Sequence, residues 1–140
     1  MLVVEDDQFV RTYLRFALER DGMAVTEAEL GETALQSIAA ELPDAVLLDG
    51  LLPDMHGVAL ADRILDDPAS AGLPICFLSG AVPGRVAAAA GVGCLSKPVK
   101  PATLTEQVRA LIAWRDGGGS PVEERRAALR RLESGFLVGP

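Results

Sequence analysis

Short apolar runs alternate with amphipathic segments along most of the chain, and this alternation limits the possible folds more than any single motif does. The runs that we expect to form strands lie at 2–4, 23–28, 45–48, 75–78 and 94–96. Apolar residues at helical spacing predict helices at 8–20, 32–41, 58–65, 86–90 and 102–115. Apolar strands that alternate with amphipathic helices are typical of a parallel sheet with helices on both faces. The order therefore predicts an α/β fold, a three-layer doubly wound (βα)5 sandwich.

Composition excludes several other classes of protein. A chain of 140 residues is long enough for one domain that needs neither disulfides nor a metal to fold. Its net charge of -7 disfavours direct nucleic acid binding by residues 1–115, because phosphate binding needs a basic face. No apolar run approaches the roughly 20 residues that span a bilayer, so we expect a cytoplasmic protein that does not contact membranes. Cys76 and Cys94 lie in apolar runs without metal-like spacing, which predicts buried free thiols.

Side chains that can bind ions or transfer groups end four of the five apolar runs. In chain order they are Glu5-Asp6, Asp49, Ser79-Gly80 and Lys97. In doubly wound sheets, ligands bind beyond the carboxyl ends of the strands. We therefore expect three carboxylates, a hydroxyl and an ammonium group to converge at one edge of the sheet.

This set of groups fits a phosphoryl-transfer site that holds a divalent cation. Neighbouring carboxylates repel one another unless a counter-charge is present, and Mg²⁺ prefers oxygen ligands of this kind. An aspartate such as Asp49 can also accept a phosphoryl group as an aspartyl phosphate. Lys97 can supply further positive charge and Ser79 a hydrogen bond to a phosphoryl oxygen, while Gly80 leaves room for the group.

Four motifs, each at a strand end, resemble those of the receiver domain of two-component response regulators, the family of the chemotaxis protein CheY. The resemblance covers about residues 1–115. The similar segments are Val3-Val4-Glu5-Asp6-Asp7 (acidic pair), Leu47 to Gly57 (phosphoacceptor loop), Leu78-Ser79-Gly80 (switch motif) and Ser96-Lys97-Pro98 (Lys-Pro motif). The resemblance implies a flavodoxin-like sheet in the order 2-1-3-4-5.

The same resemblance assigns a role to each matching position. It implies that Asp49 is the phosphoacceptor for a histidine kinase or a histidine phosphotransfer protein. The implied ligands of Mg²⁺, with Mn²⁺ as a substitute, are Glu5, Asp6, Asp49 and the backbone carbonyl of Leu51. Lys97, Ser79 and Gly80 would bind the phosphoryl group, and the peptide bond between Lys97 and Pro98 would be cis.

Three residues near the motifs have simpler interpretations. Asp7 immediately precedes the first predicted helix and suits the N-cap position. Asp54 is expected to be a solvated loop residue. His56 lies in a loop between Pro53 and Gly57, so we interpret it as a loop residue and not as a phosphorylated histidine.

The chain departs from the family pattern between Ser79 and Lys97. This segment is shorter than usual and contains the helix breakers Pro83 and Gly84, which predicts a short or distorted fourth helix. The family's aromatic switch position is Cys94 here, which puts the usual coupling of phosphorylation to output in doubt. Leu51 and Ala81 are apolar at two positions that tune the lifetime of the phosphate, so we expect slow to moderate self-dephosphorylation.

The sequence after residue 116 predicts two segments in addition to the receiver domain. We expect a receiver domain at 1–116, a flexible Gly-rich linker at 117–121 and an amphipathic helix or tail at 122–140. Four alternatives are open for the tail: it folds back on the domain, it frays in solvent, it binds a partner or forms a homodimer, or it begins a truncated output region.

Two further functions compete with the phosphorylation-controlled switch. A degenerate receiver would bind proteins constitutively, with its site retained and its switching lost. An Asp-nucleophile phosphatase would need a second Asp two residues after Asp49, where the chain has Leu51. We therefore expect a phosphoacceptor that catalyses only its own phosphoryl transfer and not a metabolic enzyme.

Overall fold

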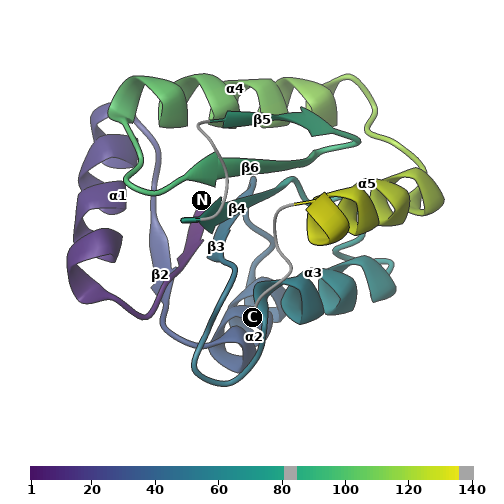
Figure 1. The fold of residues 1–140 in the computed structure, drawn as a ribbon, viewed down its shortest axis with the longest axis horizontal. Coiled ribbons are helices and arrows are strands. Elements are labelled where there is room, and N and C mark those ends of the chain that lie inside the picture. The colour runs from purple at the N-terminus through teal and green to yellow at the C-terminus, as the bar shows by residue number, and fades with distance from the viewer. Residues whose placement is uncertain (81–84, 136–140) are drawn as a thin grey trace.

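The structure is a computed structural model that describes residues 1–80 and 85–135. Its central sheet contains five parallel strands in the order β2-β1-β3-β4-β6, with an antiparallel strand, β5, at the edge beside β6 (Figure 1). The strands are β1 (Leu2–Val4), β2 (Thr26–Ala28), β3 (Val46–Asp49), β4 (Ile75–Ser79), β5 (Arg85–Ala89) and β6 (Val92–Ser96). The parallel strands confirm the doubly wound fold and the order 2-1-3-4-5.

Helices cover both faces of this sheet (Figure 1). One face carries α1 (Gln8–Arg20) and α4 (Pro101–Asp116), and the other carries α2 (Gly31–Ala40), α3 (Gly57–Asp66) and α5 (Val122–Gly135). Successive strand residues point to opposite faces, so Val3 and Leu47 pack beneath α1 and α4, whereas Val4 and Leu48 pack beneath α2 and α3. The continuous apolar runs in the sequence are explained by this burial on both sides.

Two acidic residues cap helices. Asp7 caps α1 as predicted, because its Oδ1 accepts hydrogen bonds from the backbone N–H groups of Phe9 (2.8 Å) and Val10 (3.3 Å). Asp54 is exposed, but it also caps α2 from a distant loop, since its carboxylate accepts from Gly31 (2.9 Å) and Glu32 (3.0 Å). These backbone hydrogen bonds lower the pKa of Asp54. The loop that follows β3 is thereby attached to the start of α2.

The prediction of a short fourth helix at 86–90 is wrong, because residues 85–89 form strand β5. β5 joins β6 through Ala90 and Gly91, whose positive φ angles of 52° and 70° are typical of a two-residue hairpin turn. Only residues 80–91 separate β4 from β6, which is a short span for a helix and its two loops. Within the described residues 85–91, this hairpin takes the place of the predicted helix and leads the chain to the start of β6. The breakers Pro83 and Gly84 lie outside the described residues.

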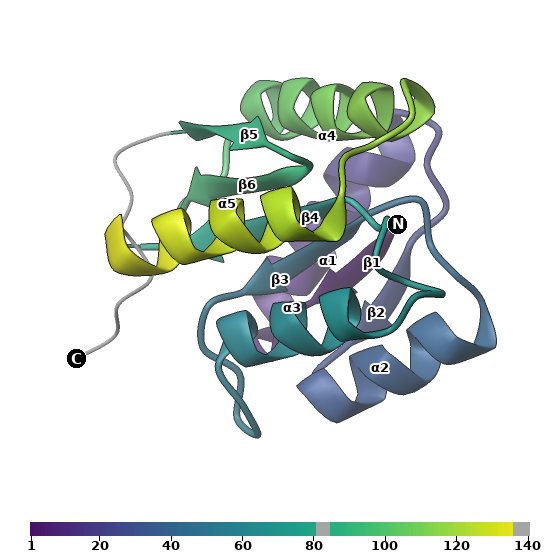
Figure 2. The ribbon, with the colours of Figure 1, turned by 90° about the vertical axis from the view of Figure 1, so that its right-hand side faces the viewer.

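Helix α5 covers the sheet face that the missing helix would have covered (Figure 2). It packs against α3 and β6, and its buried residues Ala128, Leu129 and Leu132 belong to the same core cluster as Phe77 of β4. Of the alternatives open for the C-terminal segment, the structure shows the helix folded back on the domain.

The segment expected to be a flexible linker also makes defined contacts. Gly118 and Gly119 have positive φ angles of 108° and 70°, and their N–H groups bond to carbonyls of the last turn of α4. The indole N–H of Trp114 donates to the hydroxyl of Ser120 at 2.9 Å. These bonds direct the chain from α4 across the edge of the sheet to α5.

The prediction for the two cysteines has a counterpart in the structure. Cys76 and Cys94 are free and buried, as predicted. Within residues 1–80 and 85–135, none of the helices is both long enough and apolar enough to cross a bilayer.

The packing of α5 predicts that Leu129→Ala destabilises the whole domain. Leu129 is 0% exposed, and truncating such a leucine costs about 2–5 kcal/mol of unfolding free energy. Leu42 is 54% exposed, so Leu42→Ala should change that free energy by less than about 0.5 kcal/mol. Urea denaturation of the two variants measures the difference. Equal stability of both variants would contradict the packing of α5 in the core.

Candidate metal centre

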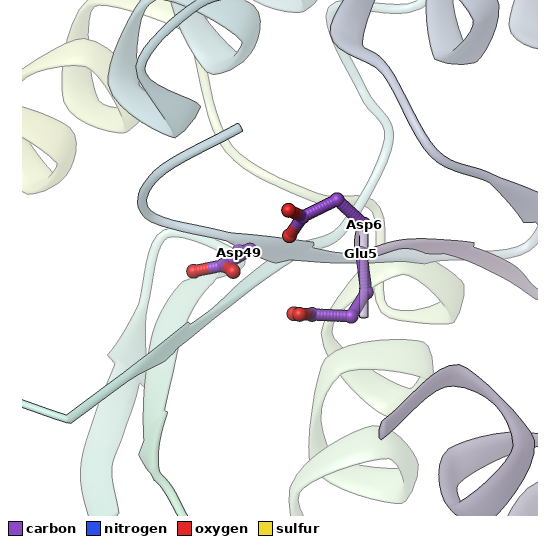
Figure 3. A group of neighbouring side chains, drawn as sticks. All are labelled: Glu5, Asp6 and Asp49. Atoms are coloured by element: carbon purple, nitrogen blue, oxygen red, sulfur yellow. The ribbon is translucent and has the colours of Figure 1, made fainter. Parts of the chain in front are cut away.

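Three carboxylates meet at the carboxyl edge of the sheet. Glu5 and Asp6 follow β1, and Asp49 ends the neighbouring parallel strand β3, with Val4 in register with Leu48. One carboxylate oxygen of each acid lies within 4.8 Å of those of the other two. Figure 3 shows the side chains of Glu5 and Asp6 extending toward Asp49. The structure thus brings together the three acids that the sequence placed at two strand ends.

The exposure of these acids is graded across the site. The side chain of Glu5 is 2% exposed and that of Asp49 is 14% exposed, whereas Asp6 is an exposed residue. A dication that approached from solvent would therefore reach Asp6 and Asp49 most directly. Three carboxylate oxygens at this spacing, with an open solvent side for water ligands, match the ligands that Mg²⁺ prefers.

Lys97 joins the acids that lie on different strands. Its Nζ donates hydrogen bonds to Asp49 Oδ2 at 3.0 Å and to Glu5 Oε2 at 3.2 Å. Lys97 follows β6, whose last residue Ser96 is in register with Ser79 of β4. The peptide bond between Lys97 and Pro98 is cis, as predicted. One ammonium group against three carboxylates leaves the cluster with a surplus of negative charge when all the acids are ionised, so a dication would balance it.

The close packing of these charges shifts their protonation equilibria. Burial, followed by the negative charge of Asp49, raises the pKa of Glu5 to about 7, although Lys97 acts in the opposite direction. Burial acts to lower the pKa of Lys97, but its hydrogen bonds and charge contacts with Asp49 and Glu5 prevail, and the pKa is raised. Lys97 therefore remains an ammonium group, while Glu5 gains or loses a proton near neutral pH.

Two other predicted residues lie beside the acids. Ser79 is half-buried at the end of β4, and its carbonyl accepts a hydrogen bond from the backbone N–H of Lys97 at 2.9 Å. Gly80 follows it, and a Cβ atom built there would meet nothing within 4 Å. The role of Gly80 in leaving room for a phosphoryl group stays a prediction.

Leu51 and Cys94 differ in how they relate to the site. Leu51 donates its backbone N–H to Asp49 Oδ1 at 3.2 Å, and its side chain lies largely in solvent. The use of its carbonyl as a metal ligand stays a prediction. Cys94 is fully buried in β6, and burial raises the pKa of its thiol to about 12. A small protonated thiol thus occupies the position where the family pattern has an aromatic side chain.

Arg11 supports the site, a role that was not predicted from the sequence. Arg11 is buried, and its Nη1 donates to the backbone carbonyls of Glu5 (2.8 Å) and Asp6 (3.2 Å). It thereby holds the backbone of the acidic pair from α1. A signal was present in the sequence, because Arg11 shares the inward stripe of α1 with Leu14 and Leu18 at helical spacing.

Gly57 is a second supporting residue whose function the sequence did not reveal. Its N–H donates to the carbonyl of Gly50 at 2.8 Å, and a Cβ atom built on it would lie 2.3 Å from the backbone oxygen of Asp49. The first residue of α3 therefore touches the backbone of the central acid, and only glycine fits there.

The part of the sequence that forms this site matches a known protein family. A family model described as the response regulator receiver domain matches residues 1–109, which include every residue of the site described in this section. The chain belongs to the response regulator receiver domain family. The expected family is therefore confirmed.

Two individual proteins show how similar this chain is to known relatives. The receiver is 38% identical over 136 residues to the transcriptional regulatory protein CseB of Streptomyces coelicolor, a match that covers 91% of this chain and 56% of CseB. A CheY-like receiver domain protein from Methanospirillum hungatei superposes with a TM-score of 0.71 at 23% identity, over 84% of this chain and 96% of that one, which shows the fold. The chain spans about half the length of the first curated relatives that it matches.

A third relative carries a metal. The receiver domain of the sensor histidine kinase PA1611 from Pseudomonas aeruginosa was solved with a magnesium ion coordinated in its active site cleft. It is 26% identical to this receiver, with a TM-score of 0.69, over 80% of this chain and 95% of that domain.

The contact between Gly57 and Asp49 predicts that Gly57→Ala disturbs the site and destabilises the domain. The added methyl group has to displace backbone atoms, so we expect a loss of about 1–3 kcal/mol in unfolding free energy. Gly72→Ala is the matched control, because a Cβ atom at Gly72 meets nothing within 4 Å. Thermal unfolding monitored by circular dichroism compares the two. If both variants melt like the wild type, α3 does not begin against Asp49 as described.

Proposed function

We propose that Asp49 accepts a phosphoryl group from a histidine kinase or a histidine phosphotransfer protein, and that this modification switches protein–protein contacts. The observation that carries the proposal is the pair of contacts that Asp49 makes with groups of both charges. Glu5 and Asp6 lie close enough to share a dication with it, and Lys97 bonds to its Oδ2. Phosphoryl transfer needs positioning and charge neutralisation more than covalent help from the protein, and this arrangement offers both.

The metal that we propose is Mg²⁺, for which Mn²⁺ can substitute. Glu5, Asp6 and Asp49 would supply carboxylate oxygens, and Leu51 its backbone carbonyl. The magnesium in the receiver domain of PA1611 supports this assignment. When bound, the metal supplies positive charge to the oxygens of the transferred group.

The chain's own residues have separate tasks in the transfer. A carboxylate oxygen of Asp49 forms a bond to phosphorus while the bond from phosphorus to the donor's imidazole nitrogen breaks, and that nitrogen keeps the electron pair. Lys97 neutralises the charge of the arriving phosphoryl group, because its ammonium group is already directed at Asp49. Ser79, at the end of β4, would donate its hydroxyl to a phosphoryl oxygen, with Gly80 beside it.

We further propose that the chain is a phosphoacceptor and not an enzyme for an external substrate, and that it acts in the cytoplasm. Leu51 presents an apolar side chain next to the site, which cannot orient an attacking water by hydrogen bonds, so we expect a slowly hydrolysed phosphate. Ala81, the second residue with this expected effect, lies outside the described residues. A constitutive binding module would retain the same bonds from Lys97 to two acids, so phosphorylation of Asp49 is the property that separates the two functions.

The packing of α5 limits which of its surfaces can contact a partner. The apolar residues of α5, Leu129 and Leu132, are buried within this chain. A homodimer or an output contact through α5 would therefore use its outer, charged face. Direct nucleic acid binding by residues 1–115 is not proposed, because that part of the chain is acidic.

Incubation with acetyl phosphate and Mg²⁺ tests the proposal. Intact-mass spectrometry should show an adduct of roughly 80 Da, the mass of one phosphoryl group. Asp49→Asn should abolish it. Asp54→Asn is the matched control, because Asp54 lies in the same loop but caps α2 and should leave the adduct in place. An unmodified wild-type protein, or an adduct that survives Asp49→Asn, would favour the constitutive binding module.

The raised pKa of Glu5 predicts that Mg²⁺ binds more weakly as pH falls. With a pKa of about 7, the ionised fraction of Glu5 drops from about nine-tenths at pH 8 to about one-tenth at pH 6, so affinity should fall about tenfold. Isothermal titration calorimetry at the two pH values measures the change. Glu5→Gln should bind weakly with little dependence on pH in this range. An equally steep dependence in that variant would assign the titration to another group.

A further inference from the structure

Helix α5 is bonded to α3 through ion pairs. Asp62 of α3 accepts hydrogen bonds from Arg126 (2.9 Å) and from Arg130 (2.5 and 2.6 Å to its two oxygens). Asp66, one turn further along α3, accepts from Arg126 at 2.8 Å. Two arginines of α5 thus hold one face of α3.

The same helix is bonded to the segments that lead into β4 and β6. Arg125 is fully buried and donates to the backbone carbonyls of Leu73 (2.6 Å), Ala90 (2.9 Å) and Gly91 (3.1 Å), and also to that of Ala71. Its guanidinium lies 4.6 Å from the centre of the Trp114 ring, whose electron-rich face attracts a cation. Arg125 therefore ties α5 to residues immediately before β4 and before β6.

Helix α3 and the strand pair β4–β6, the two parts of the domain that α5 contacts, also reach the acidic site. Helix α3 starts at Gly57, in contact with the backbone of Asp49. Strands β4 and β6 run from the segments held by Arg125 to Ser79 and Ser96, and Lys97 follows β6. The two parts of the domain, α3 on one side and β4 with β6 on the other, are consequently bridged twice. One bridge is α5, which runs beside both parts (Figure 2), and the other is the set of groups around Asp49.

We propose that docking of α5 and loading of the acidic site favour each other. The inference rests on the proposed function, because loading means Mg²⁺ together with a phosphoryl group or its mimic on Asp49. Loading would tie the loop after Asp49, which leads into α3, to Lys97 and Ser79 at the ends of β6 and β4. Once one bridge restricts the motion of the two parts, the other bridge loses less conformational entropy when it forms. Such coupling is reciprocal, so each event strengthens the other by the same factor.

Amide hydrogen exchange of α5 measures the first half of this coupling. We expect exchange in Val122–Gly135 to slow by about fivefold or more when Mg²⁺ and beryllofluoride are added, since coupling of this kind starts at about that size. Fluorescence offers a second readout, because Trp114 is the only tryptophan of the chain and lies beside Arg125. Its emission should shift as the population of docked α5 increases.

The reciprocal half uses two variants of α3. Asp62→Asn removes the charge that holds Arg126 and Arg130, and it should weaken the binding of Mg²⁺ with beryllofluoride by up to the factor by which it speeds exchange of α5. Arg63→Gln is the matched control, because Arg63 pairs with Glu32 of α2 at 3.1 Å and not with α5. It should leave both quantities as in the wild type.

Each remaining outcome decides between the two proposals. If the wild type binds the mimic but the exchange of α5 is unchanged or faster, or if Asp62→Asn leaves α5 mostly undocked and still binds the mimic as tightly as the wild type, the coupling is wrong and the proposed function stands. If the wild type does not bind Mg²⁺ with beryllofluoride, the proposed function fails and the coupling fails with it.

Discussion

The ion pairs of Lys97 are the interaction on which the site depends. A parallel sheet brings the carboxyl ends of its strands to one edge, so Glu5, Asp6 and Asp49 meet there regardless of their mutual repulsion. Lys97, which follows β6, donates hydrogen bonds to Glu5 and Asp49 and so reduces that repulsion. Arg11 of α1 holds the backbone of the acidic pair. The resulting surplus of negative charge next to a fixed ammonium group is a suitable environment for a dication and a phosphoryl group.

Local patterns were sufficient to predict most elements and the meeting of three carboxylates with Lys97 at one edge of the sheet. The predicted helices at 8–20 and 102–115 differ by at most one residue at either end from α1 and α4, because both carry a continuous inward stripe of apolar residues. Supporting contacts were less predictable. Asp54 caps α2 across 23 residues of sequence, and Gly57 is required by the position of a backbone oxygen eight residues earlier. Neither requirement is visible until the chain is folded.

The edge of the sheet shows why helix propensity misled the prediction for residues 86–90. Alanine favours helices, but the interval between β4 and β6 is short and its end contains a hairpin turn at Ala90 and Gly91. Tertiary context prevailed, and the chain formed β5. One sheet face was then left without its helix. The sequence showed that the C-terminal segment is amphipathic, but which face it would cover depended on this vacancy in the helical layer.

The residue that holds α5 in this position is charged, which has a consequence for its register. A buried leucine at position 125 would tolerate a small rotation or sliding of the helix, since apolar contacts are not directional. A guanidinium has fixed donor directions, and here its donors meet four backbone carbonyls that neighbouring segments hold in place. Any shift of α5 would leave buried donors unbonded, which is costly. Arg125 therefore restricts α5 to one docked position, and a helix restricted in this way can transmit small relative movements of α3 and the β4–β6 pair that a freely sliding helix would absorb.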